Sequence, residues 1–199
     1  MRAGPASMGS VSNKPRAVLW DMDGTLVDTE PYWMAAETAL VESFGGTWSH
    51  EDALQLVGSG LIDSAQELLR DLRAAGIPTG LVTMSLRRMA LDVVGLIEFE
   101  AFDIVVAGDD VDNPKPHPEP YLQAAALLDV DIADVVVIED SPTGLRAGLA
   151  SGALTIGVPH IVPLDGLGAH ELWATLDGRG AADLVELFGS RAAITEATR

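Results

Sequence analysis

Short runs of apolar, mostly β-branched residues recur along the chain and alternate with longer amphipathic stretches. Each run is apolar at nearly every position, which is typical of a strand buried on both faces of a parallel sheet. The predicted strands are residues 17–20, 79–82, 104–107, 135–138 and 153–158. This alternation predicts an open α/β fold, whose ligands lie at the carboxyl ends of the strands near a topological switch point.

Capping residues mark the ends of three predicted helices between these strands. The helices are expected to begin at Ser64 with Glu67 completing a capping box, at Pro118-Glu119 and at Ser141-Pro142, and to end at Gly76, after Leu128 and at Gly152. Beyond Pro159 we expect irregular structure with one short helix over residues 183–188.

The segment from Thr29 to Leu61 interrupts the alternation, because it holds two helical patterns and no strand pattern. We interpret residues 29–61 as a small helical insertion after the first strand. The predicted organisation is therefore a tail over residues 1–16, an α/β core over 17–28 and 62–199, and the insertion. Tyr32, Trp33 and Trp48 of the insertion are candidates either for its own core or for lining a pocket.

Composition and charge narrow the function classes. The formal net charge is −18, which disfavours binding to the phosphate backbone of a nucleic acid. No apolar stretch is long enough to span a bilayer, and the first 16 residues lack a secretory apolar region. The chain has no cysteine, which excludes disulfides and thiolate sites and fits a cytoplasmic protein. We expect a monomer without nucleic-acid or membrane partners.

Two acidic pairs follow predicted strands. Asp21 and Asp23 come directly after the first strand, where one carboxylate can act as a nucleophile toward phosphorus and the other as a general acid and base. Gly24 permits a tight turn of the backbone, so that main-chain N–H groups, including that of Met22, can face an anion. An acidic turn without catalytic function is the alternative. A calcium-binding loop is disfavoured, because its glycine and glutamate positions are not matched.

Glu139 and Asp140 follow the strand predicted at residues 135–138. Two adjacent carboxylates at a buried strand end are costly unless a cation compensates them, and Mg²⁺ prefers such oxygen ligands. The alternative is acidic capping of the following helix. Thr83 ends another strand and can bind a phosphate oxygen at the N-terminus of the next helix, which is expected to start near Ser85, unless Thr83 is a plain helix cap. Lys115 is one of two lysines in the chain, and its proline-rich surroundings restrict the backbone that carries it.

These motifs, in this order, resemble those of the haloacid dehalogenase-like hydrolase superfamily, in its sugar-phosphate phosphatase and β-phosphoglucomutase-like branch. The resemblance rests on Asp21-Met22-Asp23-Gly24-Thr25, Thr83, Lys115-Pro116-His117-Pro118 and Ile138-Glu139-Asp140-Ser141-Pro142-Thr143-Gly144, and it spans residues 17–158. It implies a Rossmann-like parallel sheet with a helical cap inserted after the first strand.

The resemblance also implies roles for the individual residues. Asp21 would be the nucleophile and Asp23 the general acid and then base. Mg²⁺ would be held by the Asp21 and Asp140 carboxylates and the Asp23 main-chain carbonyl, with Glu139 supporting it through water. Thr83 and Lys115 would bind the phosphoryl oxygens. Met22, Gly24 and Met84 complete the predicted phosphate-binding set.

One feature departs from the family pattern. The cap of such proteins is usually a bundle of about four helices, whereas the spacing between Asp21 and Thr83 leaves room for only two before the core helix near Ser64. A shortened cap predicts a more open pocket and favours hydrolysis over mutase chemistry, which must exclude water. We therefore expect a magnesium-dependent phosphatase acting on a small phosphorylated metabolite. The alternatives are a sugar phosphomutase, a receiver-type signalling module and a folded but inactive protein.

Overall fold

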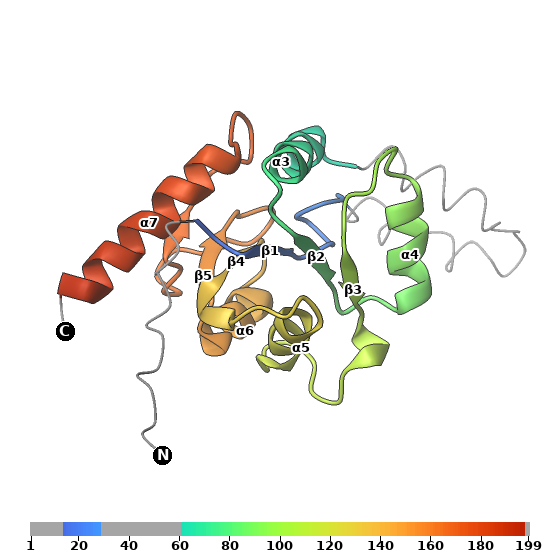
Figure 1. Cartoon of the computed structure of the whole chain (residues 1–199). Coiled ribbons are helices and arrows are strands. Elements are labelled where there is room, and N and C mark those ends of the chain that lie inside the picture. Colours follow the sequence, from blue (N-terminus) through green and yellow to red (C-terminus); the bar gives the residue numbers. More distant parts are fainter. Residues whose placement is uncertain (1–13, 29–60, 198–199) are drawn as a thin grey trace, which may run out of the picture.

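A six-stranded parallel sheet forms the centre of the molecule (Figure 1). The computed structural model describes residues 14–28 and 61–197, and the structural statements below concern these residues. The strands are β1 (Ala17–Trp20), β2 (Thr79–Val82), β3 (Ile104–Val106), β4 (Val135–Glu139), β5 (Leu154–Gly157) and β6 (Glu171–Leu172). The open parallel sheet predicted from the sequence is confirmed.

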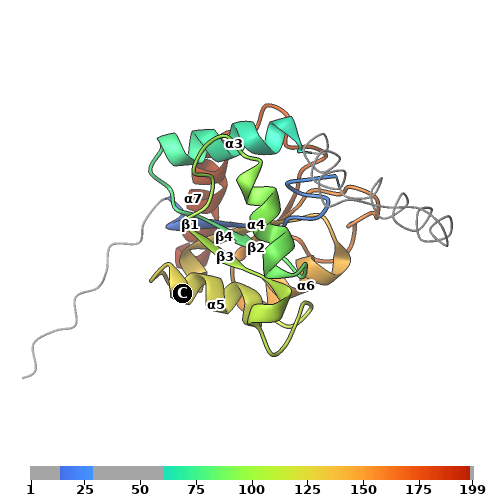
Figure 2. The same ribbon diagram turned by 90° about the vertical axis from the view of Figure 1, so that its right-hand side faces the viewer.

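Helices cover both faces of the sheet. They are α3 (Asp63–Ala74), α4 (Arg87–Gly95), α5 (Glu119–Leu127), α6 (Pro142–Ser151) and α7 (Ala181–Ala197), with single 3₁₀ turns at Gly108–Asp110 and Ile132–Asp134. In both views α3 lies on one side of the sheet and α5 on the other (Figure 1, Figure 2). None of the helices in the described part of the chain has the length and hydrophobicity needed to cross a bilayer.

The strand order β3-β2-β1-β4-β5-β6 places β1 at the centre. The chain builds one half of the sheet outward through β2 and β3, and then returns to build the other half through β4, β5 and β6. The order therefore reverses between β1 and β4, where ligands of open α/β sheets bind. Side chains of β1 alternate between two cores: Val18 and Trp20 pack with α3 and α7, whereas Ala17 and Leu19 pack with α5 and α6.

Two helix predictions need correction. Helix α3 begins at Asp63, and Ile62 at its N-cap makes no side-chain capping bond, so the capping box at Ser64 and Glu67 does not form. The entry of α3 is fixed instead by tertiary contact, because the Ile62 N–H donates to the carbonyl of Leu26 at 3.0 Å. Ser64 consequently lies inside the first turn. Helix α4 begins at Arg87, two residues after the start expected near Ser85.

The C-terminal part is more regular than expected. Helix α7 is 17 residues long, whereas a short helix over residues 183–188 was predicted. Asp71 of α3 accepts a hydrogen bond from the Ala181 N–H at 2.6 Å and so caps α7 from another element. Strand β6, which was not predicted, has two exposed residues and is too short to show a periodicity. Both features depend on contacts between distant segments.

The predicted cap falls outside the described residues. Residues 29–60, with Tyr32, Trp33 and Trp48, and the tail over residues 1–13 are not described. The described flanks of the insertion are paired, since Val27 and Leu61 form an antiparallel bridge. The two-helix cap therefore stays a prediction.

Replacing Leu72 by alanine is expected to destabilise the protein by about 3 kcal/mol, because Leu72 is fully buried between α3 and the sheet. Leu127→Ala is the matched control, because that side chain is 57% exposed. Urea unfolding of both variants measures the difference. Equal effects of the two substitutions would contradict the placement of α3.

Candidate active site

The sheet register brings the predicted site residues to one edge. Trp20 of β1 pairs with Leu81 of β2 and with Ile138 of β4, so all three strands end at the same level. The Asp21 N–H continues this register by donating to the carbonyl of Ile138 at 3.0 Å. The residues that follow each strand therefore meet at the switch point.

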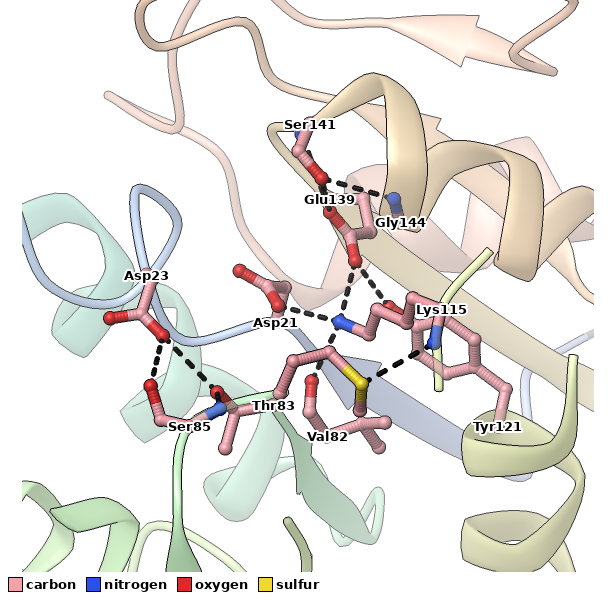
Figure 3. Close-up of polar contacts among 11 residues, drawn as sticks. Asp21, Asp23, Val82, Thr83, Ser85, Lys115, Tyr121, Glu139, Ser141 and Gly144 are labelled. Carbon is pink, nitrogen blue, oxygen red and sulfur yellow. Dashed lines mark hydrogen bonds and ion pairs between the residues drawn. The ribbon is translucent and has the colours of Figure 1, made fainter. Parts of the chain in front are cut away.

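Lys115 lies at the centre of the site (Figure 3). Its ammonium group donates to Asp21 Oδ1 at 2.6 Å, Glu139 Oε1 at 2.7 Å and the Val82 carbonyl at 2.9 Å. These contacts use all three N–H donors of the group. Because the Lys115 side chain is only 4% exposed, it serves the site and not solubility.

Glu139 is held on every side. Its Oε1 accepts from Lys115 and from the Tyr121 hydroxyl, both at 2.7 Å. Its Oε2 accepts from the Ser141 hydroxyl and N–H at 3.2 and 3.3 Å. A Cβ on Gly144 would lie 1.7 Å from Glu139 Oε1, so glycine is required there. Glu139 therefore has one fixed orientation.

Asp23 faces away from Lys115 and toward β2 (Figure 3). Its Oδ2 accepts hydrogen bonds from the Thr83 hydroxyl at 3.1 Å and the Ser85 hydroxyl at 2.9 Å. The Ser85 N–H in turn donates to Thr83 Oγ1 at 3.0 Å. The predicted general acid and the predicted phosphate-binding hydroxyl thus contact each other directly.

The turn after β1 depends on Gly24. It has a φ of +93°, and a Cβ there would lie 2.1 Å from Asp140 Oδ2. The Met22 carbonyl accepts the N–H groups of Thr25, Leu26 and Val27, which closes the turn. The Met22 side chain is buried in the core, so only its main chain is available to a ligand.

The Met84 side chain contacts the loop that carries Lys115, whereas the Met22 side chain lies in the core. The Met84 Sδ accepts the Lys115 N–H at 3.3 Å, so its side chain packs on the loop that carries the lysine. Its carbonyl also lies against Gly108, where a Cβ would be 2.3 Å from that oxygen. Binding of phosphate by Met22, Gly24 and Met84 stays a prediction.

Three carboxylates form a possible metal site. Asp21, Glu139 and Asp140 each offer an oxygen, and these oxygens lie within 4.8 Å of one another. Asp140 Oδ1 is buried and has no hydrogen-bond partner among the described residues. A buried carboxylate oxygen without a partner, on one of three clustered acidic residues, fits a hard divalent cation such as Mg²⁺. The Asp23 side chain is outside this cluster, and metal binding by its main-chain carbonyl stays a prediction.

Electrostatics make a cation favourable at this position. Burial, and then the negative charge of Glu139, raises the pKa of Asp21 well above its ordinary value, although Lys115 opposes the shift. The same two causes raise the pKa of Asp140 to about 7. Burial opposes the charge on Lys115, but Asp21 and Glu139 outweigh it and raise its pKa. Without a further cation, the carboxylates cannot all ionise cheaply at neutral pH.

Four contributors to the site were not predicted as site residues: Ser85, Tyr121, Ser141 and Gly144. Ser85 could have been noticed because it lies two residues after Thr83. Tyr121 reads as an ordinary core residue of α5 and is fully buried. Its only signal is that a buried tyrosine hydroxyl needs a partner.

Comparison with known proteins agrees with this geometry. Residues 40–152 match the family model of the haloacid dehalogenase-like hydrolases. The chain belongs to this family. This haloacid dehalogenase-like hydrolase is therefore an enzyme. Proteins similar to it are named as a phosphatase and a pyrophosphatase.

Two curated relatives are 30% identical to this hydrolase. Pyrophosphatase PpaX of Bacillus velezensis matches 71% of the chain and 82% of its own length. The phosphorylated carbohydrates phosphatase of Thermotoga maritima matches 72% and 85%. The bifunctional riboflavin kinase/FMN phosphatase of Arabidopsis thaliana is 27% identical, and the match spans 76% of this chain but only 50% of that protein.

A solved structure shares the fold. The putative β-phosphoglucomutase from Thermotoga maritima superposes with a TM-score of 0.68 and 26% identity, covering 89% of this chain and 98% of that one. The family and the α/β fold expected from the motifs are therefore confirmed.

Mg²⁺ is expected to stabilise the protein more at about pH 8 than at about pH 5.5. The folded protein holds the Asp140 proton with a pKa of about 7 against an ordinary 3.8, so metal-free stability falls as pH rises through this range. A divalent cation reverses that loss. Thermal unfolding with EDTA or MgCl₂ at both pH values measures the effect.

The Asp140→Asn variant serves as the control for this prediction. It should lose most of the Mg²⁺-dependent rise in Tm at the higher pH, because the substitution removes both the titrating carboxyl and the predicted metal ligand. A Mg²⁺ effect of the same size at both pH values in the wild type would contradict the interpretation.

Proposed function

We propose that this hydrolase is a magnesium-dependent phosphatase that cleaves a small phosphate monoester through an aspartyl-phosphate. The observation that carries the proposal is the contact of the Lys115 ammonium with Asp21 at 2.6 Å, beside the unpaired Asp140 oxygen. A lysine held against the nucleophile is where it can stabilise the charge of a transferring phosphoryl group.

Residues of the chain would perform both half-reactions. A carboxylate oxygen of Asp21 attacks phosphorus, and the bond from phosphorus to the ester oxygen breaks. Asp23 gives its proton to the departing oxygen. Asp23 then takes a proton from water, which attacks the phospho-aspartate, so that inorganic phosphate leaves and Asp21 is regenerated.

Binding of the phosphoryl group would prepare Asp23 for this work. The Thr83 hydroxyl now donates to Asp23 at 3.1 Å. A phosphoryl oxygen that accepts from Thr83 would replace this contact and leave the Asp23 carboxyl with the Ser85 hydroxyl as its remaining side-chain donor. Substrate binding would then loosen the hold on the general acid.

Asp21, Asp140 and the Asp23 main-chain carbonyl would hold Mg²⁺, with Glu139 supporting it through water. When bound, the ion supplies positive charge that neutralises the carboxylates and orients the phosphate. The buried, unpaired Asp140 oxygen supports this assignment.

Hydrolysis is favoured over phosphomutase chemistry. The two curated relatives described above bear the names of hydrolases, one a pyrophosphatase and the other a phosphatase of phosphorylated carbohydrates. The alignment with the latter relative runs over 184 positions but includes only 72% of this 199-residue chain. Part of the relative therefore has no counterpart here, which supports a shortened insertion. A smaller cap excludes water less well and so exposes the phospho-enzyme to hydrolysis. The mutase is kept as the second candidate because a structural neighbour bears that name.

The test is a Mg²⁺-dependent assay against a panel of phosphorylated metabolites, read as released phosphate and, by NMR, as isomerised sugar phosphate. The proposal predicts phosphate release that EDTA abolishes and Mg²⁺ restores. Isomerisation without phosphate release would favour the mutase, and no turnover of any ester would overturn both.

We further propose that the enzyme acts as a cytoplasmic monomer without nucleic-acid partners, in keeping with its charge of −18.

A further inference from the structure

The hydroxyl group of Tyr121 makes a contact that packing alone does not require. Tyr121 belongs to α5 and is completely buried. Its hydroxyl donates to Glu139 Oε1 at 2.7 Å, and its ring lies beneath the Lys115 ammonium, 5.0 Å from the ring centroid. One side chain thus contacts both the lysine of the site and the carboxylate that holds the lysine.

The contacts of Glu139 show what this arrangement achieves. Lys115 and Tyr121 share Oε1, while Ser141 occupies Oε2. Glu139 has no exposed surface, and Gly144 leaves no space beside Oε1. Without the tyrosine hydroxyl, Oε1 would keep Lys115 as its one donor, while Ser141 would still hold Oε2.

We propose that Tyr121 is a positioning residue for Lys115. It holds Glu139 Oε1 at the point from which the Lys115 ammonium is aimed at Asp21. This inference deepens the proposed function and its catalytic consequence rests on it. Tyr121 makes no hydrogen bond to Asp21 or Asp140, so it acts through its contacts with Glu139 and Lys115.

Alignment of a donor matters most in the transition state, where charge on the phosphoryl oxygens is redistributed. Loss of the Tyr121 hydroxyl should therefore lower kcat more than it changes KM. The affinity for Mg²⁺ should change little, because Asp21 and Asp140, the two carboxylates proposed to bind the ion directly, make no hydrogen bond with the tyrosine.

The chain allows a direct spectroscopic test, because Lys14 and Lys115 are its two lysines. Protein labelled with ¹⁵N-lysine should show a Lys115 ammonium signal that is protected from solvent exchange by burial, with exposed Lys14 as an internal reference. In Tyr121→Phe, the ring remains and the hydroxyl is lost. We expect the Lys115 signal to shift and to exchange faster, while the Lys14 signal is unchanged.

The kinetic arm uses the same full-length protein with the best ester of the panel. Tyr121→Phe should lower kcat about tenfold, which corresponds to about 1.4 kcal/mol. KM and the Mg²⁺ dissociation constant, measured by calorimetry, should stay within about twofold, since uniform binding is preserved. Thr79→Val is the control for loss of a buried hydroxyl, because Thr79 Oγ1 donates to the Ala101 carbonyl at the opposite edge of the sheet.

The outcomes separate this inference from the proposed function. An unchanged Lys115 signal in Tyr121→Phe overturns the positioning role, whether or not the enzyme turns over. A shifted signal with kcat equal to that of the wild type or of Thr79→Val also overturns it. If wild-type protein hydrolyses no ester, the proposed function fails, while the Lys115 signal still decides whether Tyr121 orients the lysine.

Discussion

Asp21→Asn is expected to abolish phosphatase activity, with turnover lowered by about 10⁴-fold or more, the scale on which loss of a covalent nucleophile acts. The amide keeps the shape of the side chain but cannot form the phospho-enzyme. Because burial and Glu139 already raise the pKa of Asp21, removing its charge should not destabilise the metal-free fold greatly. Phosphate release and thermal unfolding, measured on one preparation, check both statements.

Asp129→Asn is the matched control for this variant. It makes the same chemical change at an exposed position with a φ of +54°, which asparagine tolerates well. Its activity should equal that of the wild type. Substantial activity of Asp21→Asn would mean that another group attacks phosphorus, and the catalytic assignment would be wrong.

Lys115→Met is expected to have the largest effect on stability as well as abolishing activity. The substitution keeps the length of the side chain but leaves Asp21 and the fully buried Glu139 without their shared cation. Breaking a buried ion pair by removing one partner costs about 3 kcal/mol or more. Urea unfolding in EDTA measures the loss.

The loss caused by Lys115→Met should depend on pH. Burial raises the pKa of Asp21 and Lys115 opposes that rise, so without the lysine Asp21 binds its proton still more readily in the folded than in the unfolded protein, and the variant loses stability as pH rises. The difference from wild type should be larger at about pH 8 than at about pH 5.5. The exposed Arg88→Met variant, which also removes one positive charge, should show little change. A pH-independent loss would indicate a packing defect instead of an electrostatic one.

These two variants test one feature of the site. Four acidic residues lie close together, and different groups offset the negative charge of each. Lys115 compensates Asp21 and Glu139, while the hydroxyls of Thr83 and Ser85 hold Asp23. Asp140 keeps an oxygen without a partner among the described residues, and the proposed ion completes the balance there. Under the proposed function, the site is arranged for a metal and a phosphoryl group before either binds.

The sheet and its catalytic edge could be predicted because their signals are local. The run at residues 135–138 is apolar throughout and is followed directly by two carboxylates. One short stretch of sequence therefore predicts both a buried strand and the chemistry at its end. The family was indicated by the order of the motifs along the chain, which is Asp21, Thr83, Lys115 and then Glu139-Asp140. Parallel strands then had to bring these residues to one edge.

The missed features depend on contacts between distant segments. Asp71 caps α7 across 110 residues of sequence, and Leu26 sets the start of α3. The role of Tyr121 depends on the direction of its hydroxyl toward β4, which the apolar pattern of α5 does not encode. Ser85 contributes only because α4 starts later than expected, which leaves its hydroxyl free to face Asp23.

A crystal structure of the enzyme grown with Mn²⁺ in place of Mg²⁺ tests the central claim most directly, because anomalous scattering locates the ion. The account predicts one ion in direct contact with carboxylate oxygens of both Asp21 and Asp140, because hard divalent ions take oxygen ligands. An ion bound elsewhere, or Asp21 and Asp140 too far apart to share it, would contradict the account.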